Sequence, residues 1–145
     1  MVTYENDQLF PFPRDRVWKL LNDHLDDSLL PKIHPLVKQS RTVSRDANSI
    51  LFDRKIDARG KLLASQWRVT ARPPDSFRWE VTSGEGPYAT GSWMENTYSE
   101  EAGGTRIRSR GELKITVLPF FIPQRPVVRR VLDDIDTEDQ AYLRA

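Results

Sequence analysis

The sequence predicts an α+β domain in which a curved antiparallel sheet of about seven strands is covered by a long C-terminal helix. Apolar and polar residues alternate through most of residues 37–117, a pattern typical of strands with one buried face. Short turns separate these segments, so successive strands should pair antiparallel. Apolar residues then recur at helical spacing over residues 127–143. No linker or repeat divides the 145 residues, which indicates one domain spanning 1–145.

The N-terminal segment predicts one strand followed by two short helices. Residues 2–9 form the expected strand, and Pro11 and Pro13 end it because proline donates no hydrogen bond to a sheet. Helical spacing of apolar residues over residues 14–25 predicts the first helix. A second, short helix is expected within residues 29–35, where prolines limit its length.

Six strands are expected in the middle of the chain. The breaks between them contain Gly, Pro, Asp and Asn, which favour turns. A hairpin is expected around the glycines at 103 and 104. The six strands should cover residues 37–43, 50–57, 61–72, 77–82, 88–98 and 105–117.

The C-terminal helix is amphipathic, and its apolar side should cover the apolar face of the sheet. At 1.5 Å per residue, about 17 residues span roughly 25 Å, which is enough to cross the sheet. The expected inner residues are Val128, Val131, Leu132, Ile135 and Tyr142, and the expected outer residues are Arg129, Arg130, Asp133, Asp134 and Asp136.

Composition excludes several function classes. The absence of cysteine excludes disulfides, thiolate metal sites and cysteine nucleophiles. A formal net charge of +1 argues against a dedicated nucleic-acid binder. No apolar run is long enough to span a bilayer and no secretory signal is visible, so the expected location is the cytoplasm. His24 and His34 have no acid at metal-ligand spacing, so we expect structural roles for them and neither a metal nor another cofactor.

Short motifs resemble the START-like superfamily, also called SRPBCC. Residues 17–24 read VWKLLNDH and residues 30–35 read LPKIHP, which look like the opening helices of that superfamily. Residues 103–107 read GGTRI and resemble its last hairpin. The expected element order matches the superfamily's helix-grip fold. The similar branches are the birch-pollen-allergen-like proteins and the polyketide cyclases and dehydrases. One departure is residues 44–49, SRDANS, where the plant branch has a glycine-rich loop; a phosphate-cradling role is therefore not expected here.

The resemblance implies a function that the residue pattern alone does not give. Members of this superfamily enclose a cavity between the sheet and the long helix, where they bind lipids, sterols, polyketides or plant hormones. The expected function is therefore binding of a hydrophobic small molecule, and transport of that molecule stays open. Two alternatives stay open: a metal-free lyase or isomerase resembling polyketide cyclases and dehydratases, and a ligand-free interaction module resembling a co-chaperone domain. Expected partners exclude nucleic acid, allow only transient membrane contact, and leave a monomer or a homodimer open.

Residues in phase with the apolar face are the candidate ligand-binding set. Aromatic side chains there are either cavity walls or ordinary core. Arg54 shares the phase of Phe52 and Ile56, so its guanidinium should be inside. It would anchor a ligand carboxylate or carbonyl, pair with an internal acid, or extend its charged end outward. The candidate set is Phe52, Arg54, Ile56, Trp67, Val69, Phe77, Trp79, Trp93, Asn96, Tyr98, Ile107, Ser109, Val128 and Leu132.

The register of the strand at 88–98 decides which of its side chains face inward. Placing Tyr98 opposite Thr105 sets Glu95 opposite Arg108 and Trp93 opposite Arg110, and turns Met94, Asn96 and Tyr98 inward. A slip by one residue would instead bring Trp93 and Glu95 inside.

Two further segments have alternative interpretations. Basic residues alternate along the last expected strand, and this basic stripe is expected to be a solvated outer face rather than a phosphate site. The apolar segment at 118–123, LPFFIP, is a lid, a dimer contact or a membrane contact, or it packs beneath the closing helix. The stripe comprises Arg106, Arg108, Arg110 and Lys114.

Overall fold

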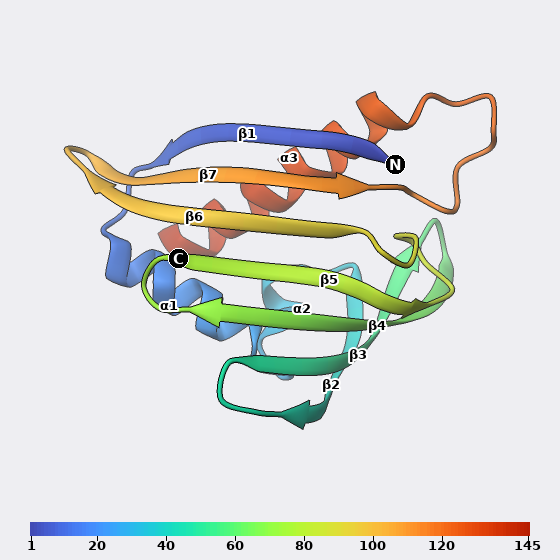
Figure 1. Cartoon of the computed structure of the whole chain (residues 1–145), viewed down its shortest axis with the longest axis horizontal. Helices are drawn as coiled ribbons and strands as arrows, with labels where there is room; N and C mark the ends of the chain where they lie inside the picture. Colours follow the sequence, from blue (N-terminus) through green and yellow to red (C-terminus); the bar gives the residue numbers. More distant parts are fainter.

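The computed structural model describes all residues 1–145, and its elements follow the expected order (Figure 1). Seven strands and three helices are present. The helices are α1 (Arg14–His24), α2 (Leu30–Ile33) and α3 (Gln124–Arg144). The strands are β1 (Val2–Phe10), β2 (Val37–Arg45), β3 (Ser49–Ala58), β4 (Lys61–Arg72), β5 (Ser76–Gly84), β6 (Trp93–Glu101) and β7 (Gly104–Leu113).

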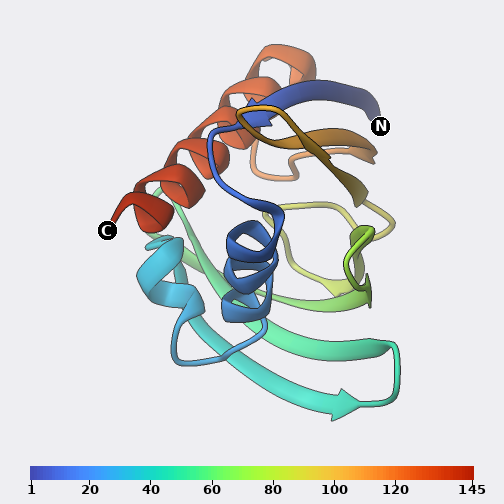
Figure 2. The same ribbon diagram turned by 90° about the vertical axis from the view of Figure 1, so that its left-hand side faces the viewer.

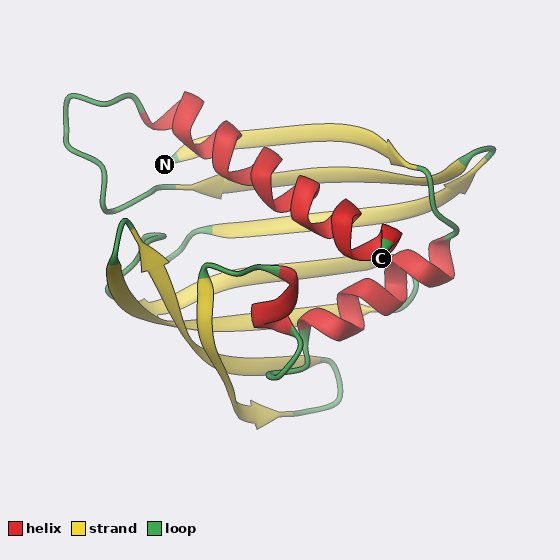
Figure 3. Cartoon of the chain, turned by 180° about the vertical axis from the view of Figure 1, so that it is seen from behind, coloured by secondary structure: helices red, strands yellow, loops and turns green.

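All seven strands form one antiparallel sheet in the order β1-β7-β6-β5-β4-β3-β2. Six strands form a meander, and β1 closes its far edge by pairing with β7. The sheet curves, and the three helices lie on its concave side (Figure 2). Helix α3 runs diagonally across that side, with α1 near its C-terminal end (Figure 3). None of the helices combines the length and apolar character needed to cross a bilayer.

The turn between β3 and β4 shows why the meander forms where the sequence predicts it. Arg59 and Gly60 both have positive φ, 55° and 83°. A two-residue hairpin needs this backbone because its twist matches that of the strands. Asp57 stabilises the turn by accepting a hydrogen bond from the Gly60 N–H at 2.7 Å.

Strand β6 begins later than the sequence predicts. The expected strand starts at residue 88, but Tyr88 forms only an isolated bridge with Ile115. The chain turns back at Gly91, where φ is 91° and the N–H donates to the Val81 carbonyl at 2.8 Å. Strand β7 likewise ends at Leu113 instead of residue 117.

The pairing of β6 with β7 differs from the expected one by two residues. Tyr98 lies opposite Ile107, and Glu95 lies opposite Arg110. A shift of two keeps every side chain on its expected face, because strand side chains alternate with a period of two. Met94 and Tyr98 are buried, whereas Trp93 is on the outer face, where it stacks under Arg78 at 4.3 Å.

The core lies between the concave face of the sheet and the helices. Val128 and Leu132 of α3 are buried in it, as expected. Asp136, expected to point away, is half-buried and accepts a hydrogen bond from Gln8 of β1 at 2.8 Å. Burial raises the pKa of Asp136 to about 6. The outer-face assignment is wrong because α3 lies so close to β1 that residues beside its apolar stripe are also covered.

The middle of the apolar segment 118–123 does not pack beneath α3. Phe120 is fully exposed and Phe121 is 71% exposed, and their rings contact each other edge to face. The lid, dimer and membrane-contact interpretations of this segment therefore stay predictions.

Candidate functional site

Four aromatic residues form a continuous wall on the inner side of the sheet. The aromatic wall consists of Phe52 of β3, Trp67 of β4, Trp79 of β5 and Tyr88 of the loop after β5. The Trp67 ring lies 4.7 Å from that of Trp79 and 5.6 Å from that of Tyr88. The Trp67 indole N–H is satisfied by the Ser65 hydroxyl at 2.7 Å, so the ring orientation is fixed.

Arg54 lies against this wall and is the main buried cation of the sheet. It is 9% exposed, and its guanidinium carbon lies 4.5 Å from the Phe52 ring centre and 5.5 Å from that of Trp67. It forms no salt bridge, and its Nε has no hydrogen-bond partner. Its Nη2 donates one long hydrogen bond, 3.5 Å, to the His24 main-chain oxygen.

Burial lowers the pKa of Arg54 to about 10, and the distant charge of Asp27 only partly opposes this. The structure therefore excludes two of the sequence-based interpretations of Arg54. The side chain neither pairs with an internal acid nor extends into solvent.

The remaining predicted site residues divide into four groups. Asn96 and Ser109 are half-buried and lie opposite each other on β6 and β7. Tyr98 is buried beside the Trp18 ring, and burial raises the pKa of its hydroxyl. Trp93 faces outward, so it cannot line a cavity on the inner face. Buried in the core are Ile56, Val69, Phe77, Ile107, Val128 and Leu132.

Two surface hollows accompany the sheet, and both border its outer face. One, of about 430 Å³, lies over β1, β6 and β7, and the other, of about 480 Å³, lies over β2 to β5. Polar and charged side chains such as Glu95, Arg110, Asp53 and Gln66 line them. Neither hollow is the apolar cavity that the resemblance implies.

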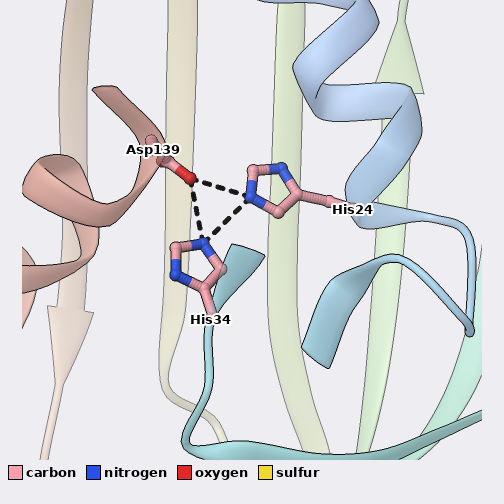
Figure 4. A group of neighbouring side chains, drawn as sticks. All are labelled: His24, His34 and Asp139. Carbon is pink, nitrogen blue, oxygen red and sulfur yellow. Dashed lines mark hydrogen bonds and ion pairs between the residues drawn. The ribbon is translucent and has the colours of Figure 1, made fainter. Parts of the chain in front are cut away.

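A second polar cluster joins the three helices (Figure 4). His24 ends α1, His34 follows α2, and Asp139 lies near the C-terminal end of α3. The two Nε2 atoms are 2.9 Å apart. Asp139 Oδ1 lies 3.0 Å from His24 Nε2 and 2.9 Å from His34 Nε2. All three side chains are 12–14% exposed.

The cluster is held by a further acid and by ring stacking. Glu138 Oε1 lies 3.0 Å from His34 Nδ1, and the two imidazole rings are parallel within 2°. Burial alone would lower the pKa of His34, but Asp139 and Glu138 outweigh it and raise that pKa. Burial would raise the pKa of Asp139, yet His24 and His34 hold it at about 2.

The expectation that no acid accompanies the histidines was wrong. Asp139 is 115 residues from His24 in the sequence, so local spacing could not place it. One signal was available: Asp139 has the same helical phase as Val128, Leu132 and Ile135. An acid on the buried side of a helix needs partners inside, just as Arg54 does on its strand.

A curved seven-stranded sheet around a long C-terminal helix, in this strand order, is the START-like helix-grip fold. Neither a family model nor a curated protein sequence matches this chain. Solved structures share the fold at low identity. Ara h 8.0201 is 15% identical with a TM-score of 0.77, and the match covers 98% of this chain and 97% of that one.

Two of the similar structures are aromatase/cyclases. The Zhui aromatase/cyclase from Streptomyces sp. R1128 is 14% identical with a TM-score of 0.72, covering 98% of this chain and 90% of that one. The di-domain ARO/CYC protein StfQ, from the steffimycin biosynthetic pathway, is 16% identical with a TM-score of 0.77. This chain covers 98% of its own length in that match and 49% of StfQ, about half of the di-domain protein. These likenesses establish the fold.

Proposed function

We propose that the protein binds a hydrophobic small molecule, such as a lipid, a sterol or a polyketide, between the sheet and α3. Arg54 holds a carboxylate or carbonyl oxygen of that molecule. The observation that carries the proposal is the buried guanidinium with an unpaired Nε, set against the faces of Phe52 and Trp67.

The energetics of Arg54 favour a ligand partner. A buried charge costs several kcal/mol unless it is paired and hydrogen-bonded. In the free protein the guanidinium has only two aromatic faces and one long hydrogen bond. A ligand oxygen would satisfy Nε, and a carboxylate would accept two parallel hydrogen bonds from the planar guanidinium. A charge-assisted hydrogen bond contributes about 1.5–3 kcal/mol.

The aromatic wall supplies the apolar part of the affinity. Burial of apolar surface contributes roughly 25 cal/mol per Å², so about 200 Å² of ligand against these rings contributes about 5 kcal/mol. Rigid rings also lose little conformational entropy on binding. The fold shared with Ara h 8.0201 and the aromatase/cyclases supports a ligand in this part of the molecule.

Binding is favoured over the cyclase alternative at this wall. Cyclisation or dehydration needs a general acid or base within hydrogen-bond reach of the substrate. The wall offers aromatic rings and the Tyr88 phenol, whose pKa burial raises, beside an arginine that forms no ion pair. These groups hold and orient a molecule rather than transfer its protons.

The test uses two matched ligands and two matched variants. Oleate and oleyl alcohol share their chain but differ in the carboxylate, and binding of each is followed by quenching of tryptophan fluorescence. We expect Arg54→Gln to weaken oleate binding at least tenfold and to leave the alcohol within about threefold. Arg68→Gln is the control, because Arg68 is exposed on the neighbouring strand.

Three results would contradict the proposal. Binding of neither ligand, with no displacement of the anionic fluorophore 1-anilinonaphthalene-8-sulfonate, would favour a ligand-free module. Equal loss for both ligands in Arg54→Gln would assign Arg54 a structural role. Equal oleate affinity in wild type and Arg54→Gln would remove the anchor.

A further inference from the structure

We propose that His24, His34 and Asp139 bind one divalent first-row transition metal ion. The metal site uses other side chains than the proposed ligand-binding site and does not depend on it. It also departs from the sequence-based expectation of no metal, because that expectation rested on local spacing alone.

The distances between the three ligand atoms fit one face of an octahedron. The atoms form a nearly equilateral triangle with edges of 2.9–3.0 Å. For nitrogen and oxygen ligands about 2.1 Å from a metal, adjacent octahedral positions lie about 3.0 Å apart, whereas tetrahedral positions lie about 3.4 Å apart. An ion above this triangle would be held by three protein ligands and keep about three positions for water or another ligand.

Hydrogen bonds alone cannot satisfy the cluster. Each Nε2 carries either one proton or one lone pair, and Asp139 Oδ1 only accepts. If both nitrogens carry protons, these face each other across 2.9 Å. If either carries a lone pair, at least one of the three contacts joins two acceptors. One edge of the triangle is therefore always repulsive, and a cation bound above its face removes that conflict because it takes up all three lone pairs.

The surroundings of His34 match those of a metal ligand. Glu138 lies 3.0 Å from Nδ1, so the Nδ1 proton points to this carboxylate and the Nε2 lone pair points into the triangle. A carboxylate behind an imidazole also raises its basicity. Glu138 and Asp139 place two negative charges beside the site, which a divalent ion would balance. The site is also largely shielded from solvent, since its side chains are only 12–14% exposed.

The ligand types select the class of metal. Two imidazoles and one carboxylate suit Zn²⁺, Fe²⁺, Co²⁺ and Ni²⁺, whereas Mg²⁺ and Ca²⁺ prefer sites made only of oxygen. The chain has no cysteine and only these two histidines, so it offers no second site of this kind.

The experiment measures metal binding to the tag-free, chelator-treated protein. Co²⁺ is titrated while its visible d–d absorption is recorded, and Zn²⁺ is titrated by calorimetry. We expect one ion per chain for each metal, competition between them, and no binding of Mg²⁺ at the same concentration. His34→Gln and Asp139→Asn should weaken Zn²⁺ binding at least a hundredfold, and Glu138→Gln should weaken it about 10–100-fold. Asp134→Asn, an exposed position on the same helix, is the matched control and should bind as wild type does.

A second measurement keeps the proposal falsifiable if a variant fails to fold. In the wild-type protein, ¹⁵N spectra should show the Nε2 resonances of both histidines shifting on addition of Zn²⁺, with saturation at one equivalent. Absence of stoichiometric Co²⁺ and Zn²⁺ binding would overturn the proposal. So would unchanged Zn²⁺ affinity in a folded Asp139→Asn variant, or unmoved histidine resonances.

Discussion

Replacing Arg54 by methionine should make the free protein more stable and a poorer binder. Methionine keeps a flexible apolar chain against Phe52 and Trp67 and removes the buried charge. The variant separates the two roles that a buried arginine can have. Removal of an arginine with a structural role lowers stability, whereas removal of an arginine whose partner is a ligand does not.

The structure sets the size of the effect. Burial lowers the pKa of Arg54 from 12.5 to about 10, and each pKa unit corresponds to about 1.4 kcal/mol, so the charged form is penalised by about 3 kcal/mol. The folded-state pKa is depressed, so the penalty is present at every pH below about 10 and is complete at pH 7. Contacts with the two rings return about 1–2 kcal/mol. We therefore expect Arg54→Met to raise the free energy of unfolding by about 1–2 kcal/mol.

Urea unfolding at pH 7, followed by circular dichroism, measures this difference directly. Arg68→Met is the control. The exposed Arg68 side chain forms only a surface ion pair, with Nη1 3.7 Å from Glu80 Oε1, so its removal should change stability by less than about 0.5 kcal/mol. A loss of more than about 1 kcal/mol in Arg54→Met, together with unchanged oleate binding, would refute the reasoning, because Arg54 would then be a structural residue.

Three further substitutions test the fold around the sites. The raised pKa of about 6 means that the wild-type protein loses stability, by about 1–2 kcal/mol, as Asp136 ionises between pH 4 and pH 6. Asp136→Asn should abolish this loss, and urea unfolding across the same pH range measures it. Thr105→Val should lower the free energy of unfolding, measured with urea, by about 1–2 kcal/mol, because the buried Thr105 hydroxyl donates to the Phe12 carbonyl at 2.8 Å. Gly104→Ala should cost at least about 2 kcal/mol in the same assay, since φ is 148° and a Cβ would meet the Phe10 carbonyl; wild-type stability would contradict this.

The sequence predicts the sheet well because alternation is a local signal. Phe52, Arg54 and Trp67 face inward as their period of two requires. The faces of β6 are also predicted correctly, although its pairing with β7 moves by two residues and sets Glu95 opposite Arg110. Pairing partners depend on where the hairpin turns, and two adjacent glycines allow more than one turn position.

Contacts between helices could not be predicted in the same way. Nothing in the spacing around His24 or His34 indicates Asp139, because the approach of α3 to α1 and α2 depends on the curvature of the whole sheet. Likewise, the burial of Asp136 depends on how closely α3 approaches β1. Helical phase indicates that such an acid is buried, but only the packed structure shows which residues of other elements contact it.

The two candidate sites meet at one residue. His24 offers its main-chain oxygen to Arg54 and its imidazole to His34 and Asp139. The polar groups that His24 contacts, Arg54 at its main chain and His34 and Asp139 at its imidazole, are the ones that depart most from the apolar pattern of the core. Buried charges rarely improve stability over apolar residues of similar volume, so packing alone does not account for them. Departures from pattern concentrate at functional or strained positions. The guanidinium on one side of His24 is suited to an anion, and the three ligand atoms on the other side are suited to a cation.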